Sequence, residues 1–321
     1  MTVSSGRAAS IGRLLGWSAV ALSFGFIGLQ LWQHAPWHLA VERVQPLAVG
    51  VAIGALMYGM AGLLLSTAWC QLLSPSVSTA STRSHHAVYG RTQIAKYLPG
   101  NLFHLVGRQV MGRQLGHGQA RLALASLLEA ALLVLIAGTL ALPIVWRWLD
   151  GALLWIIGCA GLGFMLLVFA LLRESPPLAA YLSRAAQVYH DASVPVARRL
   201  LCAATLYAGF FVVVAAIFWI VTMTVTGHRQ PSIGFGASVS VIALAWVAGF
   251  ITPGSSAGIG VREAVLIAAL EGSLDVEAST LIAVALRLVS LCGDAVFFAI
   301  GLLLSPSPAH AMSTKLGRDL P

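Results

Sequence analysis

The stretch that decides the fold is PLAVGVAIGALMYGMAGLLLSTAWCQLL, residues 46–73. It contains 28 consecutive residues without one charged side chain. A helix needs about 20 apolar residues to cross a hydrocarbon core about 30 Å thick. Residues 46–73 therefore predict a membrane-spanning helix.

The composition of the whole chain agrees with this interpretation. Of 321 residues, 58% are hydrophobic and only 9% are charged, whereas an average soluble domain has about 25% charged residues. The charged side chains are too few to cover a water-exposed surface. The sequence also has no long polar block that could form a separate soluble catalytic domain. We expect a membrane protein whose partner is a membrane lipid, with no nucleic-acid partner.

Apolar runs of similar length recur along the chain. We predict six full spans, at about residues 14–33, 46–73, 118–146, 151–172, 200–226 and 276–304. The first run would also suit a signal peptide, but it continues without a cleavage site and is interpreted as a membrane anchor. The predicted fold is all-α, a polytopic integral membrane protein with one helical domain over 1–304 and a disordered tail at 305–321.

Two further segments, 82–115 and 233–272, are hydrophobic but contain helix breakers. Irregular backbone at membrane depth is tolerated only where protein or a wet cavity satisfies its amides and carbonyls. We therefore predict two broken or re-entrant helical hairpins and place the candidate sites at their breaks. The breakers are Pro99, Gly100, Pro253, Gly254, Gly258 and Gly260.

Basic residues are distributed unevenly among the connections. Fourteen of the nineteen Lys and Arg residues lie in four regions: the N-terminus, 74–121, 173–199 and the C-terminal tail. Connections rich in Lys and Arg stay cytoplasmic, so we expect both termini in the cytoplasm. The second broken segment must then enter and leave from the outer side.

Motifs of common enzyme classes are missing. The chain has no HExxH, no CxxC pair and no P-loop, and no aspartate-rich cluster offers a metal and diphosphate site. The four cysteines stand singly in apolar runs and are interpreted as buried thiols. We therefore assign no catalytic residue, no metal ligand and no cofactor.

Polar side chains flank the break of the first segment on two helical faces. Those before the break are Gln93, Lys96 and Tyr97, and those after it are Asn101, His104 and Arg108. A basic pocket suits a phosphate, because Arg binds it with two hydrogen bonds and Lys acts as a point charge. The alternative is that the basic residues only follow the positive-inside rule and reach toward lipid head groups.

The glycine-rich turn of the second segment is expected to open a helix near Val261. A helix N-terminus presents free backbone N–H groups, and inside a membrane it suits an anionic head group. The alternative is that Pro253 and the glycines only allow a tight hairpin between packed helices. The run GIGVRE at 258–263 is not interpreted as a dinucleotide fingerprint, because a glutamate replaces the third glycine.

Three ionisable residues, Glu129, Arg287 and Asp294, lie inside predicted spans, where charges are costly and are functional candidates. We expect Arg287 to pair with Glu263 and Asp294 with Arg262, although such pairs would also serve only to hold helices together. The candidate substrate-binding residues are Gln93, Lys96, Tyr97, Pro99, Gly100, Asn101, His104, Arg108, Glu129, Pro253, Gly254, Gly258, Gly260, Arg262, Glu263, Arg287 and Asp294.

The two broken segments resemble the paired signatures of the lysylphosphatidylglycerol synthase transmembrane family. QIAKYLPGNLFHLVGR at 93–108 is similar to a K-Y-[IL]-P-G motif with a downstream G-R, and TPGSSAGIGVREA at 252–264 is similar to P-G-G-x-G-x-x-E. Residues 255–257, SSA, depart from the family's shorter or more glycine-rich turn. The resemblance implies a polytopic domain that flips an aminoacylated phospholipid in some members. Those members carry an additional soluble aminoacyl-transferase domain that makes the lipid. This sequence contains no such domain, so we expect that it does not synthesise the lipid itself.

The leading hypothesis, made with this resemblance, is a lipid translocase or lipid-binding protein of the bacterial cytoplasmic (inner) membrane that handles an anionic phospholipid or a lipid-linked head group. One alternative is a membrane-embedded enzyme with Glu263, Asp294 or His104 as acid or base, and another is a scaffold for a soluble transferase. A homo-oligomer or a partner transferase is left open. Under the leading hypothesis the two breaks approach each other, with Glu263 or Arg287 at the same polar cavity as Lys96.

Overall fold

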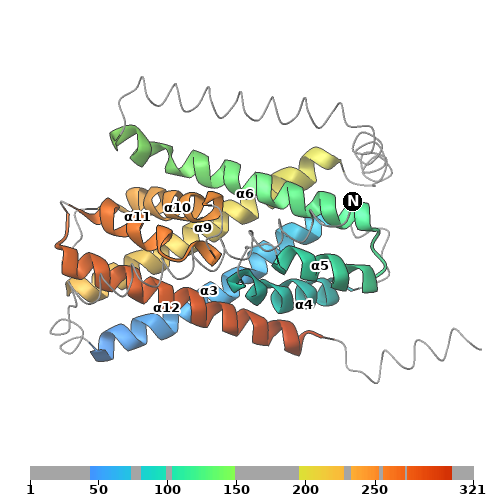
Figure 1. The fold of residues 1–321 in the computed structure, drawn as a ribbon, viewed down its shortest axis with the longest axis horizontal. Coiled ribbons are helices and arrows are strands. Elements are labelled where there is room, and N and C mark those ends of the chain that lie inside the picture. Colours follow the sequence, from blue (N-terminus) through green and yellow to red (C-terminus); the bar gives the residue numbers. More distant parts are fainter. Residues whose placement is uncertain are drawn as a thin grey trace, which may run out of the picture.

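A computed structural model describes residues 44–73, 81–98, 103–148, 195–227, 233–252, 256–271 and 273–305. Within these ranges every regular element is a helix (Figure 1), which confirms the all-α class for this part of the chain. The elements are α3 (Val44–Leu73), α4 (Thr82–Gln93), η2 (Ile94–Tyr97), α5 (Phe103–Gln114), α6 (Gln119–Trp148), α9 (Val196–Thr226), α10 (Phe235–Ile251), η3 (Ser256–Gly258), α11 (Val261–Leu270) and α12 (Val276–Leu303).

Four of these helices, α3, α6, α9 and α12, are long and apolar enough to cross a membrane. They correspond to the spans predicted at 46–73, 118–146, 200–226 and 276–304. Their 28 to 31 residues give lengths above about 40 Å at 1.5 Å per residue, more than the hydrocarbon core requires. The spans predicted at 14–33 and 151–172 and the tail beyond Ser305 lie outside the described residues.

Short sequence signals set several helix ends. Asp275 accepts a hydrogen bond from the amide of Ala278 at 2.7 Å and caps the start of α12. Gly227 ends α9 in the left-handed region, with φ of 72°, a conformation that costs glycine little. The boundaries of these spans therefore follow from local chemistry as well as from hydrophobicity.

The two predicted breaks are both present. The first lies between α4 and α5 and contains η2, and the second lies between α10 and α11 and contains η3. Figure 1 shows α4 and α5 toward one end of the bundle and α10 and α11 toward the other. Residues of η2 and η3 contact each other, so the breaks approach as expected. Pro99, Gly100, Asn101, Pro253 and Gly254 lie outside the described residues.

Glycines bring α12 close to α3 and α4. A Cβ atom added at Gly59 of α3 would lie 2.9 Å from the carbonyl oxygen of Gly293. One added at Gly90 of α4 would lie 2.9 Å from the carbonyl oxygen of Phe297. Small residues let membrane helices approach at backbone distance, so these three helices form a closely packed frame.

The cysteines are only partly as predicted. Cys70 is buried, but Cys202 on α9 and Cys292 on α12 are exposed, so the interpretation as buried thiols is wrong for those two. They lie on outward faces of long apolar helices, where a thiol behaves as a small hydrophobic group. Cys159 lies outside the described residues.

Candidate functional site

Arg108 on α5 is almost fully buried, with 1% of its surface exposed. Its Nη1 lies 2.5 Å from Oε2 of Glu129 on α6, and its Nη2 donates to Oε1 of Gln93 at 2.8 Å. Tyr89 donates its hydroxyl to the other oxygen of Glu129 at 2.6 Å, and its ring centre lies 3.6 Å from the guanidinium carbon. Arg108 is therefore paired and stacked, which favours a structural role for it over the expected phosphate contact.

Lys96 and Tyr97 of η2 both contact Asp294 on α12. The Lys96 Nζ lies 2.9 Å from Oδ1 and 2.8 Å from Oδ2, and the Tyr97 hydroxyl donates to Oδ2 at 2.5 Å. Asp294 is only 2% exposed. The expectation that Asp294 pairs with Arg262 is therefore wrong, because η2 packs against α12 and supplies the cation instead.

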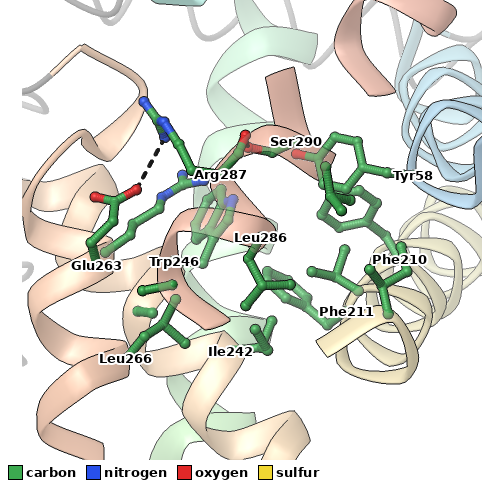
Figure 2. A pocket seen from close by; sticks show the side chains of 16 residues that line it. Tyr58, Phe210, Phe211, Ile242, Trp246, Glu263, Leu266, Leu286, Arg287 and Ser290 are labelled. Atoms are coloured by element: carbon green, nitrogen blue, oxygen red, sulfur yellow. Dashed lines mark hydrogen bonds and ion pairs between the residues drawn. The ribbon is translucent and has the colours of Figure 1, made fainter. Parts of the chain in front are cut away.

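Glu263 stands in the first turn of α11 and makes two contacts. Its Oε2 accepts a hydrogen bond from the amide of Gly260 at 2.6 Å, and its Oε1 lies 3.7 Å from Nη1 of Arg287 (Figure 2). The predicted pair of Arg287 with Glu263 is confirmed. The amide of Gly260, however, is covered by the chain's own carboxylate, so it is not free for the head group expected at this helix end.

Arg262, next to Glu263, has no carboxylate partner among the described residues. Its guanidinium carbon lies 5.9 Å from the ring centre of Trp246, and its Nε is buried without a hydrogen-bond partner. Its side chain passes over two glycines, because a Cβ added at Gly249 or Gly258 would lie 2.7 or 2.5 Å from it. The glycines of the second break thus make room for an arginine as well as for a turn.

Arg262 lines two neighbouring cavities of about 70 Å³ each. We call the first the polar cavity. His104 also lines it, with a buried Nδ1 that has no hydrogen-bond partner. Its other lining residues with polar side chains are Tyr58, Tyr89, Gln93, Lys96, Arg108, Glu129 and Trp246.

We call the second the amphipathic cavity (Figure 2). The polar groups of Glu263, Arg287 and Ser290 lie along one edge of it, and apolar side chains lie along the opposite edge. Those labelled in Figure 2 on the apolar side include Ile242, Leu266 and Phe211.

The lining of the cavities corrects the expectation that Glu263 or Arg287 shares a cavity with Lys96, and their volume limits the size of the bound group. Glu263 and Arg287 line the amphipathic cavity but not the polar cavity that Lys96 lines, and Arg262 belongs to both. A volume of about 70 Å³ holds a few waters or one small group. Sites for drug-sized ligands have about 300–1,000 Å³. In this conformation each cavity therefore fits part of a head group.

A histidine pair lies apart from both cavities. His85 of α4 donates from Nδ1 to the carbonyl oxygen of Ser81 at 2.8 Å, and its Nε2 lies 2.7 Å from Nε2 of His117, just before α6. Burial, with smaller effects of His85 and Arg121, lowers the pKa of His117 to about 4. His117 is therefore neutral at pH 7 and links α4 to the end of the first hairpin.

Comparisons with known proteins leave the family open. No protein-family model matches the chain, and no curated protein sequence matches it. The resemblance of the two motifs and the assignment of site residues therefore stay predictions.

Several residues at the cavities were not identified from the sequence. Among them, Tyr58, Tyr89 and Trp246 line a cavity, and Gly249 leaves room for the side chain of Arg262. Tyr89 precedes Gln93 by four residues, a helical spacing that could have revealed it. Tyr58 and Trp246 stand in apolar helices, where their sequence context does not separate them from core residues.

Proposed function

We propose that the protein binds the anionic head group of a membrane lipid and passes it across a bacterial inner membrane, with both chain termini in the cytoplasm. One observation carries this proposal: Arg262, a cation without a carboxylate partner among the described residues, stands where the polar and the amphipathic cavity adjoin. A desolvated, unpaired charge is costly, so an anion is the ligand that this position favours.

The amphipathic cavity supports a lipid over a soluble anion. Its polar edge, with Arg287 and Glu263, faces an apolar edge that includes Leu266 and Ile242 (Figure 2). A lipid has the same division between head group and acyl chain. A soluble phosphate has no group that could fill the apolar edge, whereas the acyl chain of a lipid can lie against it while the head group lies at the polar edge.

Translocation is supported by the arrangement of the breaks. A head group that crosses the bilayer must avoid carrying a bare charge through hydrocarbon, so it needs polar positions reached from each side. The two hairpins lie toward opposite ends of the bundle (Figure 1), and η2 and η3 meet between them. The enzyme alternative has less support, because two of its three candidate acids or bases, Glu263 and Asp294, are engaged in ion pairs.

Two measurements test the proposal. Native mass spectrometry of gently extracted protein should detect a co-purifying anionic lipid. Vesicles that contain the protein should then show movement of a head-group-labelled lipid between leaflets, and Arg262→Met should abolish it. Arg113→Met, at an exposed arginine, is the matched control and should leave it unchanged. Absence of both bound lipid and lipid movement would contradict the proposal, and a change in the mass of an added lipid would favour the enzyme.

A further inference from the structure

We propose that the group bound at Arg262 carries one negative charge, as a phosphodiester does, and that His104 gives it a second, uncharged contact. This rests on the proposed function of the two cavities. It adds the chemical class of the ligand, which separates phosphodiester lipids from phosphomonoester and diphosphate lipids.

The charge of the cavity lining carries the first step. Four basic side chains line the two cavities, and three of them have carboxylate partners. The pairs are Lys96 with Asp294 at 2.8 Å, Arg108 with Glu129 at 2.5 Å and Arg287 with Glu263 at 3.7 Å. Arg262 has no such partner in the described part of the chain, so this set of residues carries one net positive charge.

The loops at the breaks do not alter this balance. Residues 99–102 read PGNL and residues 253–255 read PGS, and neither stretch contains an ionisable side chain. In a poorly solvated cavity an unbalanced charge is unfavourable in either direction. A ligand with one negative charge restores neutrality, whereas a second negative charge would lie unpaired near Glu263 and Glu129.

His104 carries the second step. Its Nδ1 is buried without a hydrogen-bond partner and belongs to the same cavity as Arg262. A neutral imidazole can donate or accept one hydrogen bond at that atom. Protonation would add a positive charge close to Arg108 and Lys96 and is disfavoured. His104 therefore offers a contact that leaves the charge balance unchanged.

A phosphodiester fits these two contacts. Its two non-bridging oxygens share a single charge, so one can face the guanidinium of Arg262 and the other the imidazole of His104. The cavity volume of about 70 Å³ admits one phosphate-sized group, and the rest of the lipid would lie outside this cavity.

The test uses the full chain in a non-ionic detergent free of phosphate. Phosphatidylglycerol, with one negative charge, is compared with phosphatidic acid of the same acyl chains at a pH where the latter carries two. Phosphatidylglycerol should bind roughly tenfold more tightly, as expected for one unpaired charge. Equal or tighter binding of phosphatidic acid would overturn the inference while leaving lipid binding intact. Binding of inorganic phosphate without either lipid would overturn the proposed function as well.

Two variants change the charge count by one in opposite directions. Asp294→Asn releases Lys96 and should shift the preference toward phosphatidic acid. Arg262→Met removes the excess charge and should abolish the preference of either anionic lipid over diacylglycerol, whereas Arg113→Met should preserve the original order. An unchanged order in Asp294→Asn would contradict the inference. If that variant does not fold, Arg262→Met decides, because a retained preference there would contradict it equally.

Discussion

The two broken segments look alike in sequence but use their charges differently. In the first, Arg108 and Lys96 each reach a carboxylate on a long helix, Glu129 or Asp294. In the second, Glu263 caps its own helix and pairs with Arg287, and Arg262 has no carboxylate partner among the described residues. A basic residue beside a break thus has a structural role when a distant helix supplies a carboxylate partner, and it is available for a ligand when no such partner is supplied.

Helix geometry explains the difference. Residues adjacent in sequence do not face each other on a helix, so Glu263 cannot serve Arg262 while it faces the amide of Gly260 and the guanidinium of Arg287. The carboxylates of α6 and α12 come from distant parts of the chain and meet the first segment through tertiary packing. The first segment is therefore locked to the long helices, and the second retains one cation that forms no ion pair within the described part of the chain.

The largest expected effect is on the locked pair. Arg108→Met leaves Glu129 buried without its cation and should cost about 3–5 kcal/mol of unfolding free energy. Thermal unfolding in detergent, followed by circular dichroism, measures it. The double variant Arg108→Met with Glu129→Met should recover much of the loss, because both charges are then absent. A single variant as stable as the wild type would show that the first segment is not locked.

A smaller loss is expected at the second break. Glu263→Ala removes the cap of α11 and the ion-pair partner of Arg287 and should cost about 2 kcal/mol. The loss is smaller than for Arg108→Met because this pair is longer, at 3.7 Å, and Arg287 keeps a contact with the carbonyl oxygen of Ala257 at 3.4 Å. The same unfolding measurement applies. A loss as large as that of Arg108→Met would remove the contrast between the two segments.

Acid should loosen the first segment selectively. The pKa of His117 is lowered from 6.5 to about 4 in the folded chain, so the unfolded chain binds more protons between these values. Stability is then fully present above pH 6.5 and falls as the pH drops toward 4. Hydrogen exchange of α4 against α11 measures this, and His117→Gln should flatten the response. Equal acid sensitivity of both helices would contradict a local effect.

The smallest effect on stability is expected at Arg262. Arg262→Met should raise the unfolding free energy slightly, by about 0.5 kcal/mol without lipid, because it removes a desolvated cation and breaks no ion pair of the described residues. Added phosphatidylglycerol should raise the unfolding temperature of the wild type but not of this variant. A large loss of stability without lipid would mean that Arg262 has a structural role like that of Arg108.

Much of the fold followed from simple patterns, and less of the site did. Long apolar runs predicted α3, α6, α9 and α12, and Pro-Gly pairs predicted both breaks. The spacing of Gly260 and Glu263 is that of a capping box and could have shown that the helix end was covered. The partner of Asp294 could not be predicted, because sequence spacing does not determine which of several basic residues packs against α12.

The close glycine contacts are of two kinds, and the two kinds have different consequences for movement. Those of α3, α4 and α12 join separate helices at backbone distance, whereas the close contact of Gly249 is with Gly258 of its own hairpin, at 2.9 Å from an added Cβ. Packed backbones have no slack for sliding. We therefore expect the α3–α4–α12 frame to stay rigid, and the α10–η3–α11 hairpin to be the part that can move and that carries Arg262. We expect a movement that widens either cavity to displace the hairpin relative to the frame, and not to change the packing inside the frame or inside the hairpin.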